Sequence, residues 1–144
     1  MIYGLSDLHL DYTGDKSMEV FGSAWENYEQ RMFEAWKDIV KEDDYIVVPG
    51  DISWALRIDE AYNDLKRIES LPGKKIFLKG NHDLWWSSLS KVNSLNLKNM
   101  FFLQNNSFET EKYVTIPPNK AAIPQDIRFT VFPSGISSER TFLK

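Results

Sequence analysis

The chain of 144 residues has the length of one domain that can bury a substantial hydrophobic core. Its net charge of −4 argues against a general electrostatic grip on nucleic acid, which needs clustered Lys and Arg to replace counterions along the phosphate backbone. Cysteine is absent, so disulfides and thiolate metal sites are excluded, and any metal ion must be held by nitrogen or oxygen ligands. The first residues lack the basic stretch and apolar run of a signal peptide, and no apolar segment reaches membrane-spanning length. We therefore expect a cytoplasmic protein with no membrane partner.

Short apolar runs alternate with amphipathic segments in the first eighty residues. The runs 2–6, 45–48 and 75–78 are expected to be buried strands. Apolar residues recur every three or four positions over 28–40, and again over 59–68, where Asp59 is the expected N-cap. This order predicts an α/β fold with a βαβαβ unit, whose strands are parallel and joined by right-handed crossovers.

The pattern weakens in the second half of the chain. Residues 85–95 suggest a third helix, 100–103 a fourth strand, and Asn105-Asn106 a turn before a return strand from Ser107. After residue 110 there is no Trp and no His, and four of the six prolines occur there. We therefore divide the chain into a domain at residues 1–110 and a poorly specified tail at 111–144.

A polar cluster follows each of the first three predicted strands. The clusters are Asp7 with His9, Gly50-Asp51, and Gly80-Asn81-His82-Asp83. Asp7 and His9 are two residues apart, so on an extended strand end their side chains would leave the same face. The first two clusters, taken singly, are more often solvated turns than ligands. Parallel strands bring their carboxyl ends to one edge of a sheet, however, and together the clusters indicate a site there.

These motifs, in this order, resemble those of the calcineurin-like metallophosphoesterases over residues 1–108. The longer strings that run from Pro49 to Trp54 and from Gly80 to Trp86 look like those of a small bacterial group of these proteins. The resemblance implies the first half of a four-layer α/β/β/α sandwich. It also implies two divalent metal ions, Mn²⁺, Fe²⁺/Fe³⁺, Zn²⁺ or Mg²⁺, and hydrolysis of phosphate mono- or diesters by a metal-activated hydroxide.

The resemblance also implies a role for each polar residue. Asp7 and His9 would hold the first metal ion, Asp51 would bridge both ions, and Asn81 would supply an amide oxygen to the second. His82 would stabilise or protonate the leaving oxygen. Asp83 would orient that imidazole.

The chain departs from the family pattern in one respect. The family completes its site with further histidines from the second half of the fold, whereas His9 and His82 are the only histidines here. We interpret the tail as truncated or frame-shifted. One alternative is a non-catalytic fragment that binds phosphate or a partner and self-associates through an incomplete core. Another is a nuclease, if Trp54, Trp85 and Trp86 line a groove for nucleobases, but core and rim packing of these aromatics is favoured.

Overall fold

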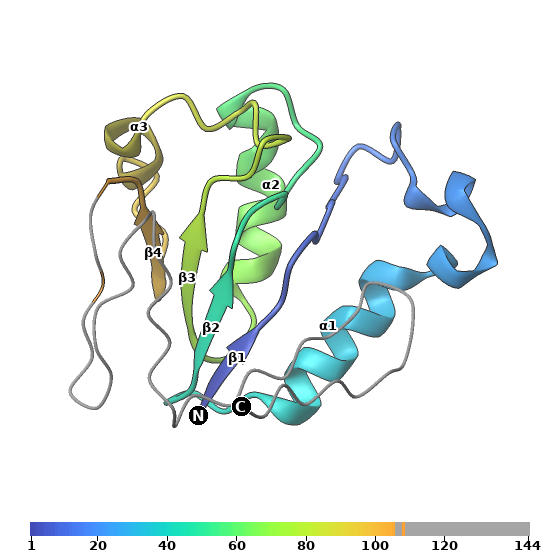
Figure 1. Cartoon of the computed structure of the whole chain (residues 1–144), viewed down its shortest axis with the longest axis horizontal. Helices are drawn as coiled ribbons and strands as arrows, with labels where there is room; N and C mark the ends of the chain where they lie inside the picture. The colour runs from blue at the N-terminus through green and yellow to red at the C-terminus, as the bar shows by residue number, and fades with distance from the viewer. Residues whose placement is uncertain (106–107, 109–144) are drawn as a thin grey trace, which may run out of the picture.

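A four-stranded parallel sheet forms the centre of the computed structural model, which describes residues 1–105 and 108 (Figure 1). The strands lie in the order β1-β2-β3-β4, so each crossover joins neighbouring strands. The strands are β1 (Ile2–Gly4), β2 (Tyr45–Val48), β3 (Lys74–Leu78) and β4 (Met100–Leu103). The helices are α1 (Tyr28–Ile39), α2 (Ile58–Glu69) and α3 (Leu89–Asn93), with two short 3-10 helices, η1 (Met18–Phe21) and η2 (Ser23–Trp25).

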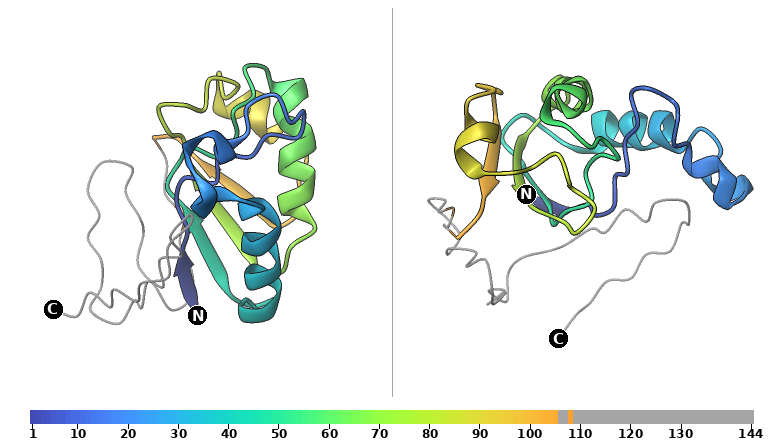
Figure 2. Two further views of the ribbon diagram at one scale, coloured as in Figure 1. Left: turned by 90° about the vertical axis from the view of Figure 1, so that its right-hand side faces the viewer. Right: turned by 90° about the horizontal axis from the view of Figure 1, so that it is seen from above.

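All three α-helices pack against one face of the sheet. Right-handed crossovers between consecutive parallel strands require this arrangement, and Figure 2 shows α1 and α2 on the same side of the strands. Buried residues of the helices and of this sheet face form a single hydrophobic cluster. Its members include Trp36, Val40, Ala61, Leu65, Ile68, Val92, Ile46, Val48, Phe77 and Phe102.

The opposite face of the sheet is also apolar. Ile2, Val47, Ile76 and Leu103 are buried there and form a second, smaller cluster. A parallel sheet with two apolar faces is typical of a layered α/β domain, in which both faces are covered. The α/β class and the parallel strand order predicted from the sequence are therefore confirmed.

Two local predictions were wrong. Asp59 does not cap α2: it lies in the first turn and pairs with Arg57, while the carboxylate of Glu60 accepts the backbone N–H groups of Arg57 and Leu56. The third helix is also shorter than the predicted 85–95: it spans Leu89–Asn93, and the residues before it form a turn in which the backbone N–H of Trp86 donates to the carbonyl of Asp83 at 3.2 Å. Ser88 caps α3, and its hydroxyl accepts a hydrogen bond from the backbone N–H of Lys91.

Several predictions lie outside the described residues. They are Asn106 in the predicted turn, the return strand from Ser107, and the tail at 111–144. Within residues 1–105, no helix combines the length and the apolar character that crossing a membrane requires.

Lys75 is a fully buried cation at the start of β3. Its ammonium group donates hydrogen bonds to the backbone carbonyls of Glu69, at 3.3 Å, and Leu71, at the end of α2. Glu69 is the last residue of α2, where a carbonyl has no intrahelical N–H partner, and Leu71 lies two residues beyond the helix. Burial lowers the pKa of Lys75, because the charged form loses hydration.

Replacing Lys75 with methionine should lower the free energy of unfolding by about 1–3 kcal/mol, since buried carbonyls would lose their donor. The folded-state pKa is below the unfolded value, so the unfolded chain binds the proton more tightly. The stability of the wild type should therefore rise with pH through the window below the ordinary lysine pKa of 10.5, and the difference from Lys75→Met should grow there.

Urea denaturation from pH 7 to 10 measures this difference. The half-buried Lys74 provides the matched control, because its ammonium lies over the Tyr45 ring instead of at a helix end. A Lys74→Met variant should show no comparable pH-dependent difference. Equal pH profiles for the Lys75→Met variant and the wild type would contradict the assignment of Lys75 as a buried cation with a lowered pKa.

Candidate metal centre

The chain segments that follow β1 and β2 run side by side beyond the ends of the strands. The backbone N–H of His9 donates to the carbonyl of Asp51 at 3.0 Å, and that of Leu10 donates to Ile52 at 3.0 Å. Leu10 and Ser53 form an isolated parallel bridge. The pairing of β1 with β2 therefore continues into the two segments that carry the first two polar clusters.

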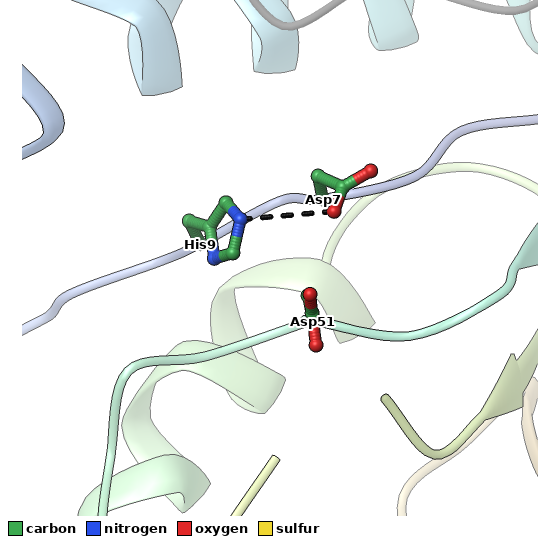
Figure 3. A group of neighbouring side chains, drawn as sticks. All are labelled: Asp7, His9 and Asp51. Carbon is green, nitrogen blue, oxygen red and sulfur yellow. Dashed lines mark ion pairs between the residues drawn. The ribbon is translucent and has the colours of Figure 1, made fainter. Parts of the chain in front are cut away.

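These paired segments bring Asp7, His9 and Asp51 together (Figure 3). One ligand atom from each of the three residues lies within 4.8 Å of the other two, and all three residues are half-buried. The backbone conformation that brings these side chains together differs from the extended one predicted from the sequence. Asp7, His9 and Asp51 have φ values of 56°, 46° and 53°, so their backbone is left-handed and not extended. Non-glycine residues held in this region cost about 1–3 kcal/mol each and cluster at functional sites.

The donor set fits a divalent cation. Two carboxylates and an imidazole are ligands that Mn²⁺, Fe²⁺ and Zn²⁺ accept, and the three donors approach from two backbone segments. Burial lowers the pKa of His9, against the opposing effect of Asp51 and Asp7. A lowered pKa keeps the imidazole neutral and able to donate a lone pair to a metal ion at neutral pH. The geometry therefore supports these three residues as one metal-binding group.

A close approach of two glycines places the segment after β3 against the segment after β2. A Cβ atom on Gly50, whose φ is +126°, would lie 2.5 Å from the Cα atom of Gly80. A Cβ atom on Gly80 would lie 2.2 Å from both the backbone N and Oδ1 of Asp51. The Asp51 carboxylate thus rests on Gly80, and its Oδ1 accepts a hydrogen bond from the backbone N–H of His82 at 3.0 Å.

The carboxylate of Asp83 is fully buried and joins the two segments from inside. Its Oδ2 accepts the backbone N–H groups of Asp51, at 2.9 Å, and Gly80, at 2.8 Å. Its Oδ1 accepts the N–H groups of Ile52 and Ser53, at 2.8 and 3.3 Å, and the indole N–H of Trp85, at 3.1 Å.

The expected pairing of Asp83 with the His82 imidazole is therefore corrected. Both carboxylate oxygens are already engaged by these five donors, because the side chain turns inward under the loops while His82 is exposed. Asp83 fixes the backbone that carries Asp51.

The remaining predicted site residues lie at the surface of the loop after β3. Asn81 and His82 are both exposed. The centre of the His82 ring lies 6.2 Å from that of the His9 ring and 5.2 Å from the Trp54 ring. His82 is thus next to the Asp7, His9 and Asp51 group, and Asn81 precedes it in the same loop.

Trp54 is a part of the site whose contact with His9 the sequence did not predict. Its ring stacks on His9 with centroids 4.7 Å apart and planes inclined by 16°. Trp85 and Trp86 are buried, with 2% and 0% exposure, so packing is confirmed for these two and they line no nucleobase groove. The only sequence signal for Trp54 was its position three residues after Asp51.

Tyr28 and Arg67 also support the His9 segment and were missed. The Tyr28 hydroxyl donates to the carbonyl of His9 at 2.6 Å, and burial raises the pKa of this phenol, so it remains a donor. Arg67 bridges Glu29 and the buried Asp64. No sequence motif identifies these residues, because their pairing depends on the packing of α1 against α2.

A hollow of about 510 Å³ lies next to Tyr28 and Arg67, against α1. Its wall contains four carboxylates, from Asp11, Glu19, Glu29 and Glu34, and two cations, from Lys37 and Arg67. The excess of negative charge makes it unfavourable for a phosphate group. The group of Asp7, His9 and Asp51 is the better candidate for phosphate chemistry, because a divalent cation held there would offset the charge of its carboxylates.

Comparison with families of known proteins shows to which family this chain belongs. The family described as calcineurin-like phosphoesterase matches residues 1–142. The chain belongs to this family. The match extends beyond residue 110, where the sequence analysis had placed the domain boundary. No curated protein sequence gives a significant match.

One solved structure is similar in fold to this calcineurin-like phosphoesterase chain. It is the crystal structure of a protein of unknown function, AQ665, from Aquifex aeolicus, with 20% sequence identity and a TM-score of 0.51. The alignment covers 77% of this chain and 55% of AQ665. This chain therefore matches about half the length of that protein, and the similarity concerns the fold alone.

Replacing Gly80 with alanine should disrupt the site of this calcineurin-like phosphoesterase chain. The new methyl group would overlap the backbone and carboxylate of Asp51, so that residue must move. We expect a loss of about 1–3 kcal/mol in the free energy of unfolding, as for other overpacked positions, together with weaker Mn²⁺ binding. Chemical denaturation and calorimetric titration with Mn²⁺ measure the two effects.

Gly14 provides the control for this substitution. A Cβ atom there would contact nothing within 4 Å, and its φ of +76° makes Gly14→Ala a purely conformational change. That variant should lose stability without losing Mn²⁺ affinity. Equal Mn²⁺ affinity in Gly80→Ala and the wild type would show that the contact of Asp51 with Gly80 does not position a ligand.

Proposed function

We propose that this chain is a metal-dependent phosphoesterase that hydrolyses phosphate mono- or diesters. The observation that carries the proposal is the convergence of Asp7, His9 and Asp51, within 4.8 Å, at the carboxyl edge of a parallel sheet. Ligands of open α/β sheets bind at this edge. Membership of the calcineurin-like phosphoesterase family supports the same chemistry.

The proposal assigns a role to each polar residue. Asp7 and His9 would hold a first divalent ion, Asp51 would be shared with a second, and Asn81 would supply an oxygen to the second. Bound divalent metal ions supply Lewis acidity and lower the pKa of water toward neutrality. A shared carboxylate would offset the repulsion between two cations. Mn²⁺, Fe²⁺/Fe³⁺, Zn²⁺ and Mg²⁺ are the candidate ions, because all accept oxygen or imidazole ligands.

His82 is proposed to donate a proton to the leaving oxygen. Its exposure leaves the ring accessible to a substrate, and its backbone N–H holds Asp51. A positioned acid of this kind contributes about 10²–10⁴-fold to the rate. Asp83 acts indirectly in this proposal: it positions the backbone of Asp51 through the hydrogen bonds described above.

The proposed partner is a phosphate ester in the cytoplasm. Nucleic acid is not favoured, because the net charge is −4 and the hollow lined by Asp11, Tyr28 and Glu29 is acidic. A non-catalytic chain that binds phosphate remains the alternative, motivated by the absence of histidines other than His9 and His82. Assays of binding and of turnover separate the two.

The test is Mn²⁺-dependent hydrolysis of an aryl phosphodiester and an aryl phosphomonoester by the 144-residue chain. Asp51→Asn should reduce turnover to background and weaken Mn²⁺ binding, because a carboxylate ligand is lost. His82→Ala should lower kcat by about 10²–10⁴-fold while leaving Mn²⁺ affinity close to wild type, since His82 is assigned to proton transfer.

Asp59→Asn is the matched control, because Asp59 is exposed and pairs with Arg57 on α2. It should leave turnover unchanged. A folded wild type that binds Mn²⁺ and has no turnover would favour the non-catalytic alternative. Turnover that survives in Asp51→Asn would contradict the assignment of the site.

A further inference from the structure

Among the described residues, the imidazole of His9 has no hydrogen bond to another protein group. A metal-binding histidine almost always donates its second ring N–H to a carboxylate, a carbonyl or water, which fixes the orientation of the ring. Within residues 1–105, the polar contact recorded for the His9 ring is Asp7 Oδ1, 3.7 Å from Nε2. That separation is too long for a hydrogen bond. A contact with the face of the ring can therefore contribute to its orientation.

Trp54 makes that contact. Its ring lies nearly parallel to the His9 ring, with centroids 4.7 Å apart, and it also touches His82, at 5.2 Å and an angle of 59°. The two imidazole centroids are 6.2 Å apart. The indole thus packs on one imidazole and contacts the other, and it can set the spacing between them.

The backbone of Trp54 is anchored to the His9 segment. Its N–H donates to the carbonyl of Leu10 at 2.9 Å, and its carbonyl accepts from the Lys16 ammonium at 3.0 Å. The same residue lies three positions after Asp51. The indole therefore extends from the segment that carries Asp51 onto the ring carried by the neighbouring segment.

Hydrogen bonding does not explain a tryptophan at this position. Among the described residues, the indole Nε1 of Trp54 is the buried side-chain nitrogen or oxygen without a hydrogen-bond partner. An unpaired buried donor opposes folding, and a phenylalanine would provide an aromatic face without it. The contribution of Trp54 is therefore the planar face of its ring.

We propose that Trp54 is a positioning residue of the metal centre, which holds the His9 ring by stacking and sets its distance from His82. This inference rests on the proposed function, because it assumes that His9 is a metal ligand. In this proposal Trp54 acts through the two imidazoles that it contacts, those of His9 and His82. Outer contacts of metal ligands typically change metal affinity by about 10–100-fold when they are removed.

Zn²⁺ titration of the full chain, labelled at histidine and followed by NMR, tests the proposal. The chain has two histidines, so the ring signals of His9 and His82 can be assigned separately. In the wild type, Zn²⁺ should shift the His9 signals. Trp54→Leu removes the aromatic face and should weaken Zn²⁺ binding by about 10–100-fold. Trp54→Phe restores a face and should recover most of the affinity.

Phe101→Leu is the control for loss of a partly exposed aromatic side chain, since Phe101 lies within β4. It should bind Zn²⁺ as the wild type does. Wild-type affinity in a folded Trp54→Leu variant would overturn the proposal. An equal loss in Trp54→Phe and Trp54→Leu would also overturn it, because stacking would then not be the cause.

A second measurement applies if Trp54→Leu does not fold. Nuclear Overhauser contacts between the Trp54 indole and the His9 ring, in the metal-free wild type, should show the stacked arrangement. Their absence would overturn the proposal. If Zn²⁺ leaves the wild-type His9 signals unchanged, the metal centre itself is contradicted, and these contacts still decide whether Trp54 holds the ring.

Discussion

The buried carboxylate of Asp83 is the interaction on which the site depends. It accepts backbone N–H groups from Asp51, Ile52, Ser53 and Gly80, which belong to the segments after β2 and β3. Loop backbones of this kind have no strand partner for these N–H groups, and leaving buried donors unpaired is costly. One acceptor with two oxygens satisfies all four groups. As a result, Asp51 is held in a left-handed conformation that an isolated loop would seldom adopt.

Gly50 and Gly80 are needed because the two loops bound by Asp83 lie so close together. Two loops that share one acceptor must approach closely, and the Cβ distances at Gly50 and Gly80 show that no side chain fits between them. The Asp51 carboxylate then rests on the backbone of Gly80 and accepts the N–H of His82. The position of a proposed ligand is thus set by backbone contacts, which are more rigid than contacts between flexible side chains.

A second polar network supports the segment that carries His9. Ser53 donates to Asp64 at 2.7 Å, Asp64 pairs with Arg67, and Arg67 pairs with Glu29. Glu29 accepts the backbone N–H of Asp11 at 3.1 Å. The network connects both site segments to α1 and α2. Burial raises the pKa of Asp64 above its usual range, although Ser53 and Arg67 oppose this shift. The helices therefore contribute to the site as well as to the core.

The amino-acid sequence by itself determined the strands, the helical periodicity, the parallel order and the residues Asp7, His9, Asp51 and His82 as candidates. It could do so because apolar periodicity and strand-end motifs are local signals. Only the tertiary structure decided the role of Asp83, the left-handed backbone of the ligands and the stacking of Trp54 on His9. These features arise where three segments distant in sequence satisfy one another's hydrogen bonds and volumes, and no periodicity within one segment records that.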